Sequence, residues 1–480
     1  MQFMPSWMRN YQRSWLSGDL VAGVIVTVML IPQSLAYALL AGLPPEVGLY
    51  ASILPIVAYA LLGSSMTLAV GPVAVASLMT ASALQPLAAA GSAEYVGLAM
   101  LLSLLSGGML LLFGLLRLGF LAHFLSHPVI SGFISGSAIQ SAVGQLKHLM
   151  GVKAGGGNVL DTLLQLAHAV PHTNGVTSGI GAGSVLFLLL ARKSLAPWLV
   201  RAGVDAKLAE LASKLAPMLA VLVSTALVAA LRWDKSAGVS IVGAVPQGLP
   251  KLALPPVAAS AIGQLWLPAL LISLVGFVES VSVAQSLALK RQQRIQPNRE
   301  LLGLGAANVA SALSGGFPVT GGFARSVVNF SAGANTPLAG VVSAMLMAVV
   351  IAALTGLFHY LPHAVLAATI IVAVVSLVDV QTLREAWRYD KADAWSLLAT
   401  AGGVIAWGVE VGILMGVGLS LGTLVWRSSH PHIAVVGRVP GTEHFRNIVR
   451  HPVATEHDLI AVRVDESLYF ANSEVLQDSI

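Results

Sequence analysis

The chain has 480 residues, of which 56% are hydrophobic and 10% charged, with a formal net charge of +5 and no cysteine. Soluble domains carry about 25% charged residues, so this composition excludes a soluble enzyme, a disordered chain and a nucleic-acid-binding protein. The lack of cysteine also excludes a disulfide framework, a thiolate metal site and a thiol nucleophile.

Apolar segments follow one another from Ser17 to Arg427, and a membrane-spanning helix needs about 20 apolar residues. We therefore predict an all-α polytopic membrane protein, with a cytoplasmic N-terminus (residues 1–16), a transmembrane domain (17–430) and a further C-terminal domain (431–480). About 14 transmembrane segments are predicted, beginning near Asp19, Gly48, Thr67, Glu94, Pro128, Val176, Leu208, Gln264, Arg299, Thr320, Pro337, Pro362, Ala394 and Val409.

Basic residues concentrate in alternate loops of this arrangement. Lys290, Arg291 and Arg294 share one such loop, whereas Lys153 and Arg232 are among the few basic residues in the loops between. The positive-inside rule places the basic loops in the cytoplasm. We expect a multi-pass protein of the bacterial inner membrane with both termini in the cytoplasm, and the positive charge requires no nucleic-acid partner.

Two of the predicted segments are interrupted by Gly and Pro in the middle of the membrane. They are TLAVGPVAVAS at residues 67–77 and GGFPVTGGFARS at residues 315–326. Proline removes a backbone donor and clashes with the preceding turn, yet it is tolerated in the first turn of a helix. Each segment is therefore predicted to be a short extended piece followed by a half-helix that begins near the bilayer centre.

An internal repeat supports this interpretation. Pro72-Val73 recurs as Pro318-Val319, and the same shift of 246 residues carries Gln33-Ser34 onto Glu279-Ser280. Seven segments in each half is an odd number, so the second repeat (about 258–430) is expected to be inverted relative to the first (about 17–232). Inverted repeats with paired broken helices are typical of secondary transporters. The alternative is a chance match in a chain rich in Ala, Val and Pro.

Arg325 and Glu279 are the charged residues on which the predicted site depends. Arg325 lies within about two turns of the second half-helix start, and helix N-termini attract anions. A charge inside the membrane is costly and implies a partner, which for Arg325 is either a transported anion or Glu279. Glu279 is predicted to be the proton-coupling group. The alternatives are a purely structural ion pair between the two, and a fixed counter-charge without proton transport.

Four further residues are predicted to contribute to the pocket. Gln33 offers an amide donor without charge, and Tyr37, one turn later, offers an aromatic wall with a hydroxyl group. Val73 and Phe323 are predicted to line an apolar side. Hydrogen bonding between helices is the alternative for Gln33 and Tyr37, and simple packing is the alternative for the other two.

Three motifs resemble the SulP family of sulfate and other anion permeases. They are IPQSLAYALLAGLPPEVGLY from Ile31, the segment with Gly71-Pro72, and GGFPVTGGFARSVVNFSAGANTPLAG from Gly315. The tail, RVPGTEHFRNIV from Arg438 and DLIAVRVDESLYFANSEVL from Asp458, resembles the opening of a STAS domain, of which residues 431–480 would form about half.

The resemblance implies a definite architecture and site. It implies seven plus seven inverted segments, a core domain that moves against a gate domain in an elevator-like cycle, and a homodimer. It also implies an anion site between the third and tenth segments, with contributions from the first and eighth. Carried over by position, the site residues are Gln33, Tyr37, Val73, Ala74, Glu279, Gly322, Phe323, Ala324 and Arg325.

This chain departs from the family pattern just before the arginine. Many relatives carry hydroxyl side chains there, whereas this chain has Gly322, Phe323 and Ala324, so the anion is expected to rely on backbone N–H groups. The acid of the eighth segment is Glu rather than Asp, with Ser280 nearby, which favours protons over sodium as the coupling ion.

The sequence therefore predicts a secondary active transporter of small anions such as sulfate, bicarbonate or a C4-dicarboxylate, driven by proton symport. An anion exchanger or channel of the same fold and a proton-coupled nucleobase carrier are the alternatives, and Arg325 argues against the carrier of a neutral base. An intramembrane enzyme would need a nucleophile and a base together in the bilayer, and the sequence offers no such pair. No cofactor and no metal are predicted.

Overall fold

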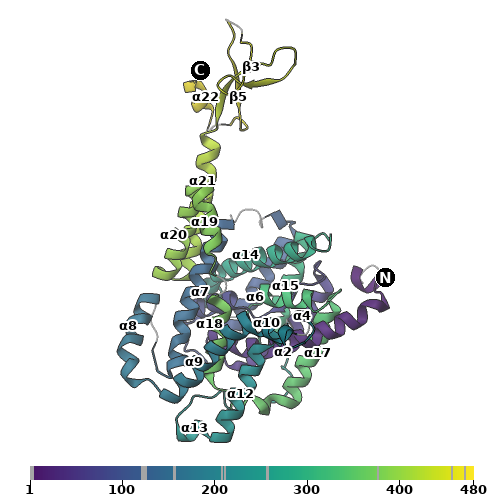
Figure 1. Ribbon diagram of the computed structural model, residues 1–480, viewed down its shortest axis with the longest axis vertical. Helices are drawn as coiled ribbons and strands as arrows, with labels where there is room; N and C mark the ends of the chain where they lie inside the picture. Colours follow the sequence, from purple (N-terminus) through teal and green to yellow (C-terminus); the bar gives the residue numbers. More distant parts are fainter. Residues whose placement is uncertain are drawn as a thin grey trace. The chain divides into compact units, whose positions relative to one another are not determined.

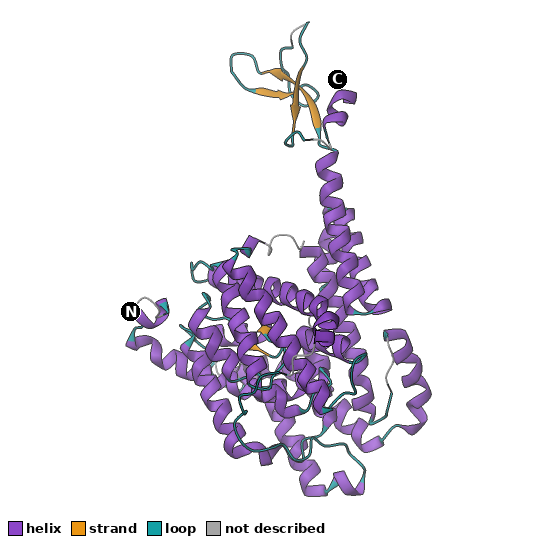
Figure 2. Cartoon of the chain, turned by 180° about the vertical axis from the view of Figure 1, so that it is seen from behind, coloured by secondary structure: helices purple, strands orange, loops and turns teal. Residues whose placement is uncertain are grey.

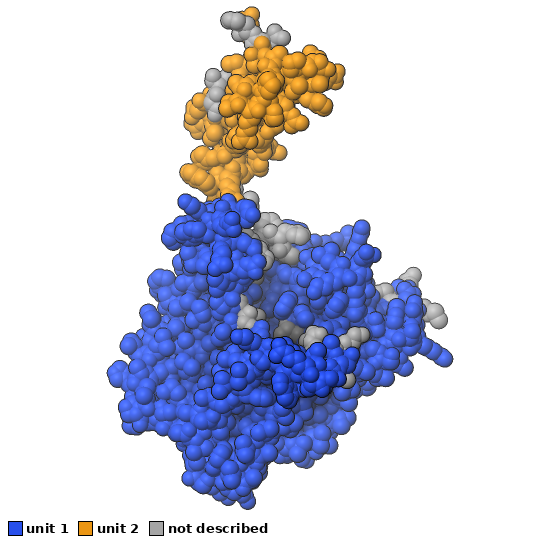
Figure 3. Space-filling view, viewed as in Figure 1, with its two compact units in different colours: residues 1–416 blue, residues 417–480 orange. Residues whose placement is uncertain are grey.

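The computed structural model describes residues 5–120, 127–154, 158–206, 209, 212–213, 215–255, 259–375, 378–455, 458–469 and 472–479. The chain divides into two compact units, Met1–Gly416 and Val417–Ile480, which Figure 3 shows in different colours. The first unit is almost entirely helical, and the second carries a small sheet.

The helices of the first unit that matter most for its organisation have the following bounds: α2 (Leu16–Leu40), α3 (Pro45–Tyr50), α4 (Leu54–Leu62), α5 (Ala74–Leu84), α6 (Ala93–Leu115), α7 (His127–Met150), α9 (Gly175–Leu190), α12 (Ala216–Leu231), α14 (Ala259–Leu289), α15 (Pro297–Leu313), α16 (Phe323–Ser331), α17 (Leu338–Val349), α18 (His363–Val375), α19 (Val380–Tyr389) and α20 (Lys391–Trp407). The helix α21 (Val409–Ser429) runs across the boundary between the units.

Seven stretches of helix within the described residues are long and apolar enough to cross a membrane. Two further apolar helices, α5 and α12, are shorter. The prediction of a largely helical, multi-pass protein is confirmed by this pattern. The stretches are Arg13–Leu40, Pro45–Leu62, Ala93–Leu115, Gly175–Arg201, Ser260–Leu289, Leu338–Phe358 and the one that starts at His363.

The two interrupted segments are broken as the sequence predicts. Each contains a two-residue strand, β1 (Val70–Gly71) and β2 (Thr320–Gly321), followed by a short helix, α5 or α16. The strands pair with each other in antiparallel register, Val70 with Gly321 and Gly71 with Thr320. Figure 2 shows this small ladder in orange among the helices. Extended backbone is tolerated at membrane depth only where its polar groups are satisfied inside the protein, and the ladder achieves this.

The strand β2 is also held by α14. The backbone N–H of Gly321 donates to Oγ of Ser280 at 2.8 Å, and the Ser280 hydroxyl donates to the carbonyl of Gly276 at 2.6 Å. A Cβ at Gly276 would lie 2.4 Å from Cγ2 of Thr320, so only glycine allows the helix to approach the strand this closely. Glu279 is thereby fixed on the helix that packs against β2.

Two buried carboxylates fix the turns beside the broken segments. Glu300 on α15 accepts from the Tyr59 hydroxyl (2.6 Å), the Ser64 hydroxyl (2.6 Å) and the backbone N–H groups of Ser64 (2.7 Å) and Ser65 (2.9 Å). Asp19 on α2 accepts from the backbone N–H of Asn335 (2.6 Å) and from the Thr336 hydroxyl (2.6 Å). The first carboxylate secures the turn that leads into β1, and the second secures the turn between α16 and α17.

Replacing Glu300 with alanine is expected to lower the free energy of unfolding by about 3 kcal/mol or more, because the buried donors of Tyr59, Ser64 and Ser65 lose their acceptor. The purified protein in detergent is heated in steps, and its monodisperse elution peak is recorded after each step. The measurement is the temperature at which half of this peak is lost. Glu385→Ala, on an exposed part of α19, is the control and should leave this temperature unchanged. Equal midpoints for the two variants would contradict this role of Glu300.

The second unit contains a three-stranded antiparallel sheet in the order β4-β3-β5, labelled in part in Figure 1. Its strands are β3 (Ile433–Arg438), β4 (Phe445–Asn447) and β5 (Ala461–Val464), and the helix α22 (Ser473–Ser479) follows. Ile433 pairs with Val464, and Val436 pairs with both Ala461 and Asn447. The described residues of the second unit therefore combine strands with helices, whereas the first unit is almost entirely helical.

Candidate functional site

The two half-helices begin beside the β1–β2 ladder. Val73 and Gly322, the residues before α5 and α16, are both extended, and neither helix start is capped by a side chain. The first turn of a helix leaves backbone N–H groups without partners in the helix, and its end carries a partial positive charge. The ladder thus places two positively polarised helix starts next to each other.

Arg325 lies in the first turns of α16 and is only 2% exposed. Its guanidinium group lies against the backbone of both broken segments. A Cβ at Gly71 would be 3.2 Å from Nη1 and 3.3 Å from Nη2, and a Cβ at Gly322 would be 3.2 Å from Nη2. Side chains at these two positions would crowd the guanidinium, so the glycines provide the room for it.

The guanidinium of Arg325 has no hydrogen-bond partner within the described residues: Nε, Nη1 and Nη2 are all buried and unbonded. Buried charges in proteins are normally paired, because an uncompensated one costs several kcal/mol. The structural ion pair with Glu279, which the sequence left as an alternative, is therefore not formed as a hydrogen bond. A permanent positive charge faces the junction of the two half-helices.

Glu279, Tyr37 and Gln33 come from the two helices that flank this junction. Tyr37 on α2 interacts electrostatically with both Arg325 and Glu279. Gln33 precedes Tyr37 by one turn on the same face of α2, and all three side chains are partly buried. The helix α2 packs against α5 and α16, and α14 packs against α5, α16 and β2.

The remaining predicted residues lie at the helix starts. Val73 and Ala74 are each 7% exposed, and Cγ1 of Val73 would be 3.1 Å from a Cβ at Gly322. Phe323 is 52% exposed, so about half of its side chain is not covered by the rest of the described protein. Ala324 belongs to the first turn of α16, and its side chain lies outside the described residues.

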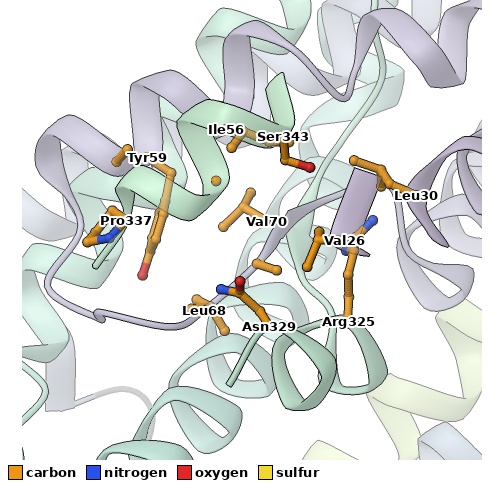
Figure 4. Close-up of a pocket in the computed structure, with 13 residues that line it drawn as sticks. Val26, Leu30, Ile56, Tyr59, Leu68, Val70, Arg325, Asn329, Pro337 and Ser343 are labelled. Atoms are coloured by element: carbon orange, nitrogen blue, oxygen red, sulfur yellow. The ribbon is translucent and has the colours of Figure 1, made fainter. Parts of the chain in front are cut away.

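A small cavity of about 20 Å³ lies on one side of Arg325, and Figure 4 shows the side chains around it. Arg325 is the one predicted site residue among those that line it. Asn329 also lines the cavity and was not among the residues predicted from the sequence, although its position one helical turn after Arg325 was a usable signal. The lining residues are Val26, Leu30, Ile56, Tyr59, Ala60, Leu68, Ala69, Val70, Arg325, Asn329, Pro337, Gly340 and Ser343.

Comparisons with known protein sequences match this chain to sulfate transporters. The model of the sulfate permease family matches residues 16–400. The chloroplastic sulfate transporter 4.1 of Arabidopsis thaliana is 37% identical over 486 aligned positions, which cover 99% of this chain and 68% of that protein. A probable sulfate transporter of Mycobacterium tuberculosis is 38% identical over 467 positions, which cover 97% of this chain and 80% of that protein.

Solved structures share the fold. The murine solute carrier 26 family member A9 anion transporter, in its inward-facing state, matches 99% of this chain and 80% of its own with a TM-score of 0.89 at 23% identity. The transmembrane domain of a cyanobacterial bicarbonate transporter, BicA, matches 85% of this chain and 98% of its own with a TM-score of 0.70 at 25% identity. The first of these similarities is one of fold alone.

Proposed function

Since the chain belongs to the sulfate permease family, a family of transporters and not of enzymes, we propose that it is a secondary active transporter that carries small anions, namely sulfate, bicarbonate or a C4-dicarboxylate, together with protons. The observation that carries this proposal is the buried guanidinium of Arg325, which has no hydrogen-bond partner in the described part of the chain and lies beside two half-helix starts. Sulfate and bicarbonate appear in the names of related transporters, which supports this choice of anions.

The anion would bind at the junction of α5 and α16. Arg325 supplies a charge and a planar set of N–H donors, which suit the oxygens of an oxyanion. The backbone N–H groups at the starts of the two half-helices, near Ala74 and Ala324, would supply further donors. Gly322 brings the backbone close to the anion because it has no side chain to intervene.

Gln33 and Tyr37 would close the site from α2. Their amide and hydroxyl groups donate hydrogen bonds without adding charge, so they can select an oxyanion while the net charge is set by Arg325 and Glu279. Val73 and Phe323 would form the apolar wall, which keeps water away from the ion and strengthens its attraction to the guanidinium.

Glu279 would be the proton-coupling group. It lies on α14, within electrostatic range of Tyr37, which in turn interacts with Arg325. We propose that Arg325 favours the ionised form of this carboxylate, so that an anion which neutralises the arginine promotes binding of a proton to Glu279. The two ions would then cross the membrane together.

The finer architecture is part of the same proposal. The chain would form 14 transmembrane segments as seven plus seven inverted repeats, divided into a core and a gate domain that move in an elevator-like cycle. It would act as a homodimer in the bacterial inner membrane, with both termini in the cytoplasm. Residues 431–480, with their strands β3 to β5, would be the opening part of a STAS domain.

An anion-binding screen with the purified protein tests this function. An anion that binds the native state raises its thermal midpoint by an amount that grows with concentration. We expect sulfate, bicarbonate or succinate to raise the midpoint of the wild-type protein, and neutral uracil to leave it unchanged. Stabilisation by uracil and by none of the anions would overturn the proposal in favour of a nucleobase carrier.

A further inference from the structure

Arg291 follows the end of α14 and reaches the turn that follows α16. Its backbone N–H donates to the carbonyl of Ala288 at 3.0 Å, so the residue is tied to the last turn of α14. Nη1 of its guanidinium donates to the carbonyl of Ala334 at 2.6 Å, and Cζ lies 4.4 Å from the centre of the Phe330 ring. One side chain therefore joins the end of α14 to the end of α16.

Asp19 on α2 holds the same peptide group from its other side. The carbonyl of Ala334 and the backbone N–H of Asn335 belong to one peptide bond, and this N–H donates to Oδ1 of Asp19 at 2.6 Å. A donor at the carbonyl and an acceptor at the N–H polarise the group in the same direction, so each hydrogen bond strengthens the other. Together, Arg291, the Ala334–Asn335 peptide group and Asp19 form a peptide clamp.

The two ends of the peptide clamp carry opposite charges. Asp19 is fully buried and Arg291 is half-buried. Burial lowers the pKa of the Arg291 guanidinium, and the attraction of Asp19 offsets part of this effect. Buried charges are normally paired, because an unpaired one is costly. The clamp is thus an ion pair bridged by one peptide group, and it links α2 to α14 through the turn after α16.

These three helices carry the charged and polar groups of the proposed anion site. Gln33 and Tyr37 lie on α2, Glu279 lies on α14, and Arg325 lies on α16. Asp19 is about 21 Å from Gln33 along α2, at 1.5 Å per residue, so the clamp is remote from the anion. It acts on the site only through the positions of the helices.

The helix α16 depends on such support. It has nine residues, and isolated helices shorter than about 12–15 residues are marginal. It also carries Arg325 in its first turns, where the positive end of a helix disfavours a cation. Arg291 supplies a cation at the opposite end, where a cation is favourable, and its Nη2 lies 3.5 Å from the carbonyl of Phe330. Ser280 already holds β2, so α14 secures the segment at both ends.

We propose that Arg291 is a positioning residue for anion binding, which acts through the peptide clamp to hold Arg325 where the polar groups of α2 and α14 converge. This inference rests on the proposed function, because it presumes an anion that Arg325 binds. Without Arg291, the turn after α16 can move away from α14, and the guanidinium of Arg325 moves with it. A binding site loses affinity when its supporting residues let the binding groups shift.

Titration calorimetry with sulfate tests the positioning role. Arg291→Ala should bind sulfate about three- to 30-fold more weakly than the wild type, which is the range that remote substitutions produce through packing. Arg294→Ala removes the same charge from an exposed arginine of the same loop and should bind as the wild type does. Arg291→Lys keeps the cation and one donor, so it should recover most of the lost affinity.

A merely structural role of Arg291 predicts a different result. At a temperature well below the thermal midpoints of all variants, a substitution that only lowers stability leaves the Kd of the folded protein unchanged. A lower midpoint of Arg291→Ala with the same sulfate Kd as Arg294→Ala would overturn the proposal. If Arg291→Ala yields no monodisperse protein, Arg291→Gln replaces it, because it keeps a neutral donor for the Ala334 carbonyl.

Hydrogen exchange tests the peptide clamp without any anion. The backbone N–H of Asn335 is protected by its bond to Asp19, and loss of Arg291 weakens this bond. Peptides that contain Asn335 should exchange about three- to tenfold faster in Arg291→Ala than in Arg294→Ala, measured by mass spectrometry. Equal exchange rates in the two variants would overturn the clamp.

The two measurements separate failure of this inference from failure of the proposed function. If the wild type binds sulfate and Arg291→Ala binds it equally well, the positioning role is overturned and the proposed function stands. If the wild type binds none of sulfate, bicarbonate and succinate, the proposed function and the positioning role fall together, whereas exchange at Asn335 still decides the clamp.

Discussion

Replacing Arg325 with alanine is expected to abolish anion uptake while the protein remains folded. Loss of a buried, charge-assisted partner costs about 2–5 kcal/mol of binding free energy, so uptake should fall at least about 30-fold. The measurement is uptake of radiolabelled sulfate, and of bicarbonate and succinate in parallel, into proteoliposomes that contain equal amounts of wild-type and variant protein.

Arg325→Ala is also expected to affect the thermal stability of the protein, in the direction opposite to that of most substitutions of buried residues. The guanidinium has no hydrogen-bond partner among the described residues, so alanine removes an uncompensated buried charge. The thermal midpoint of the anion-free variant should therefore be equal to or higher than that of the wild type. When a bound anion neutralises the arginine, the thermal midpoint of the wild type should rise and the difference between the two proteins should disappear.

Two variants serve as controls for Arg325→Ala. Arg232→Ala also removes one positive charge, but from an exposed arginine that bonds the Tyr360 hydroxyl at 2.8 Å, and uptake should be unchanged. Arg325→Lys keeps the charge and loses the planar fork of donors, so it should bind anions more weakly than the wild type but better than alanine. Unchanged uptake by Arg325→Ala would refute the site.

Replacing Glu279 with glutamine is expected to remove the dependence of uptake on a pH gradient. For one proton carried with each anion, one pH unit is equivalent to about 1.4 kcal/mol, which is about tenfold in the accumulation ratio. Wild-type proteoliposomes should accumulate more anion when the outside is more acidic than the inside. The variant, which cannot exchange a proton at this position, should show the same uptake with and without the gradient.

Glu385→Gln is the matched control for this experiment. It makes the same change at an exposed acid on α19, which is bonded to the Gln381 amide at 2.8 Å, and it should respond to the gradient as the wild type does. Anion binding by Glu279→Gln, measured by thermal stabilisation without a gradient, should persist. Gradient-driven accumulation by Glu279→Gln would show that another group carries the proton.

The sequence by itself determined the helical, membrane-spanning character of the chain and the two places where helices break. These properties are local. A run of about 20 apolar residues predicts a span whatever surrounds it, and Pro72 and Pro318 lack the backbone donor that an uninterrupted helix requires. The spacing of Gln33 and Tyr37 on one face of α2 follows in the same way from the helix period.

Only the tertiary structure decided what the broken segments do together. The pairing of Gly71 with Thr320 and the contact of Arg325 with Gly71 join residues from opposite halves of the chain, and the approach of α14 to β2 through Gly276 joins two separate segments of the second half. The cavity with Asn329 and the cluster around Glu300 depend on the same long-range packing. Hydropathy and residue spacing describe each segment relative to its own axis. Which faces meet is decided by close packing and by the need to satisfy buried polar groups across the whole fold.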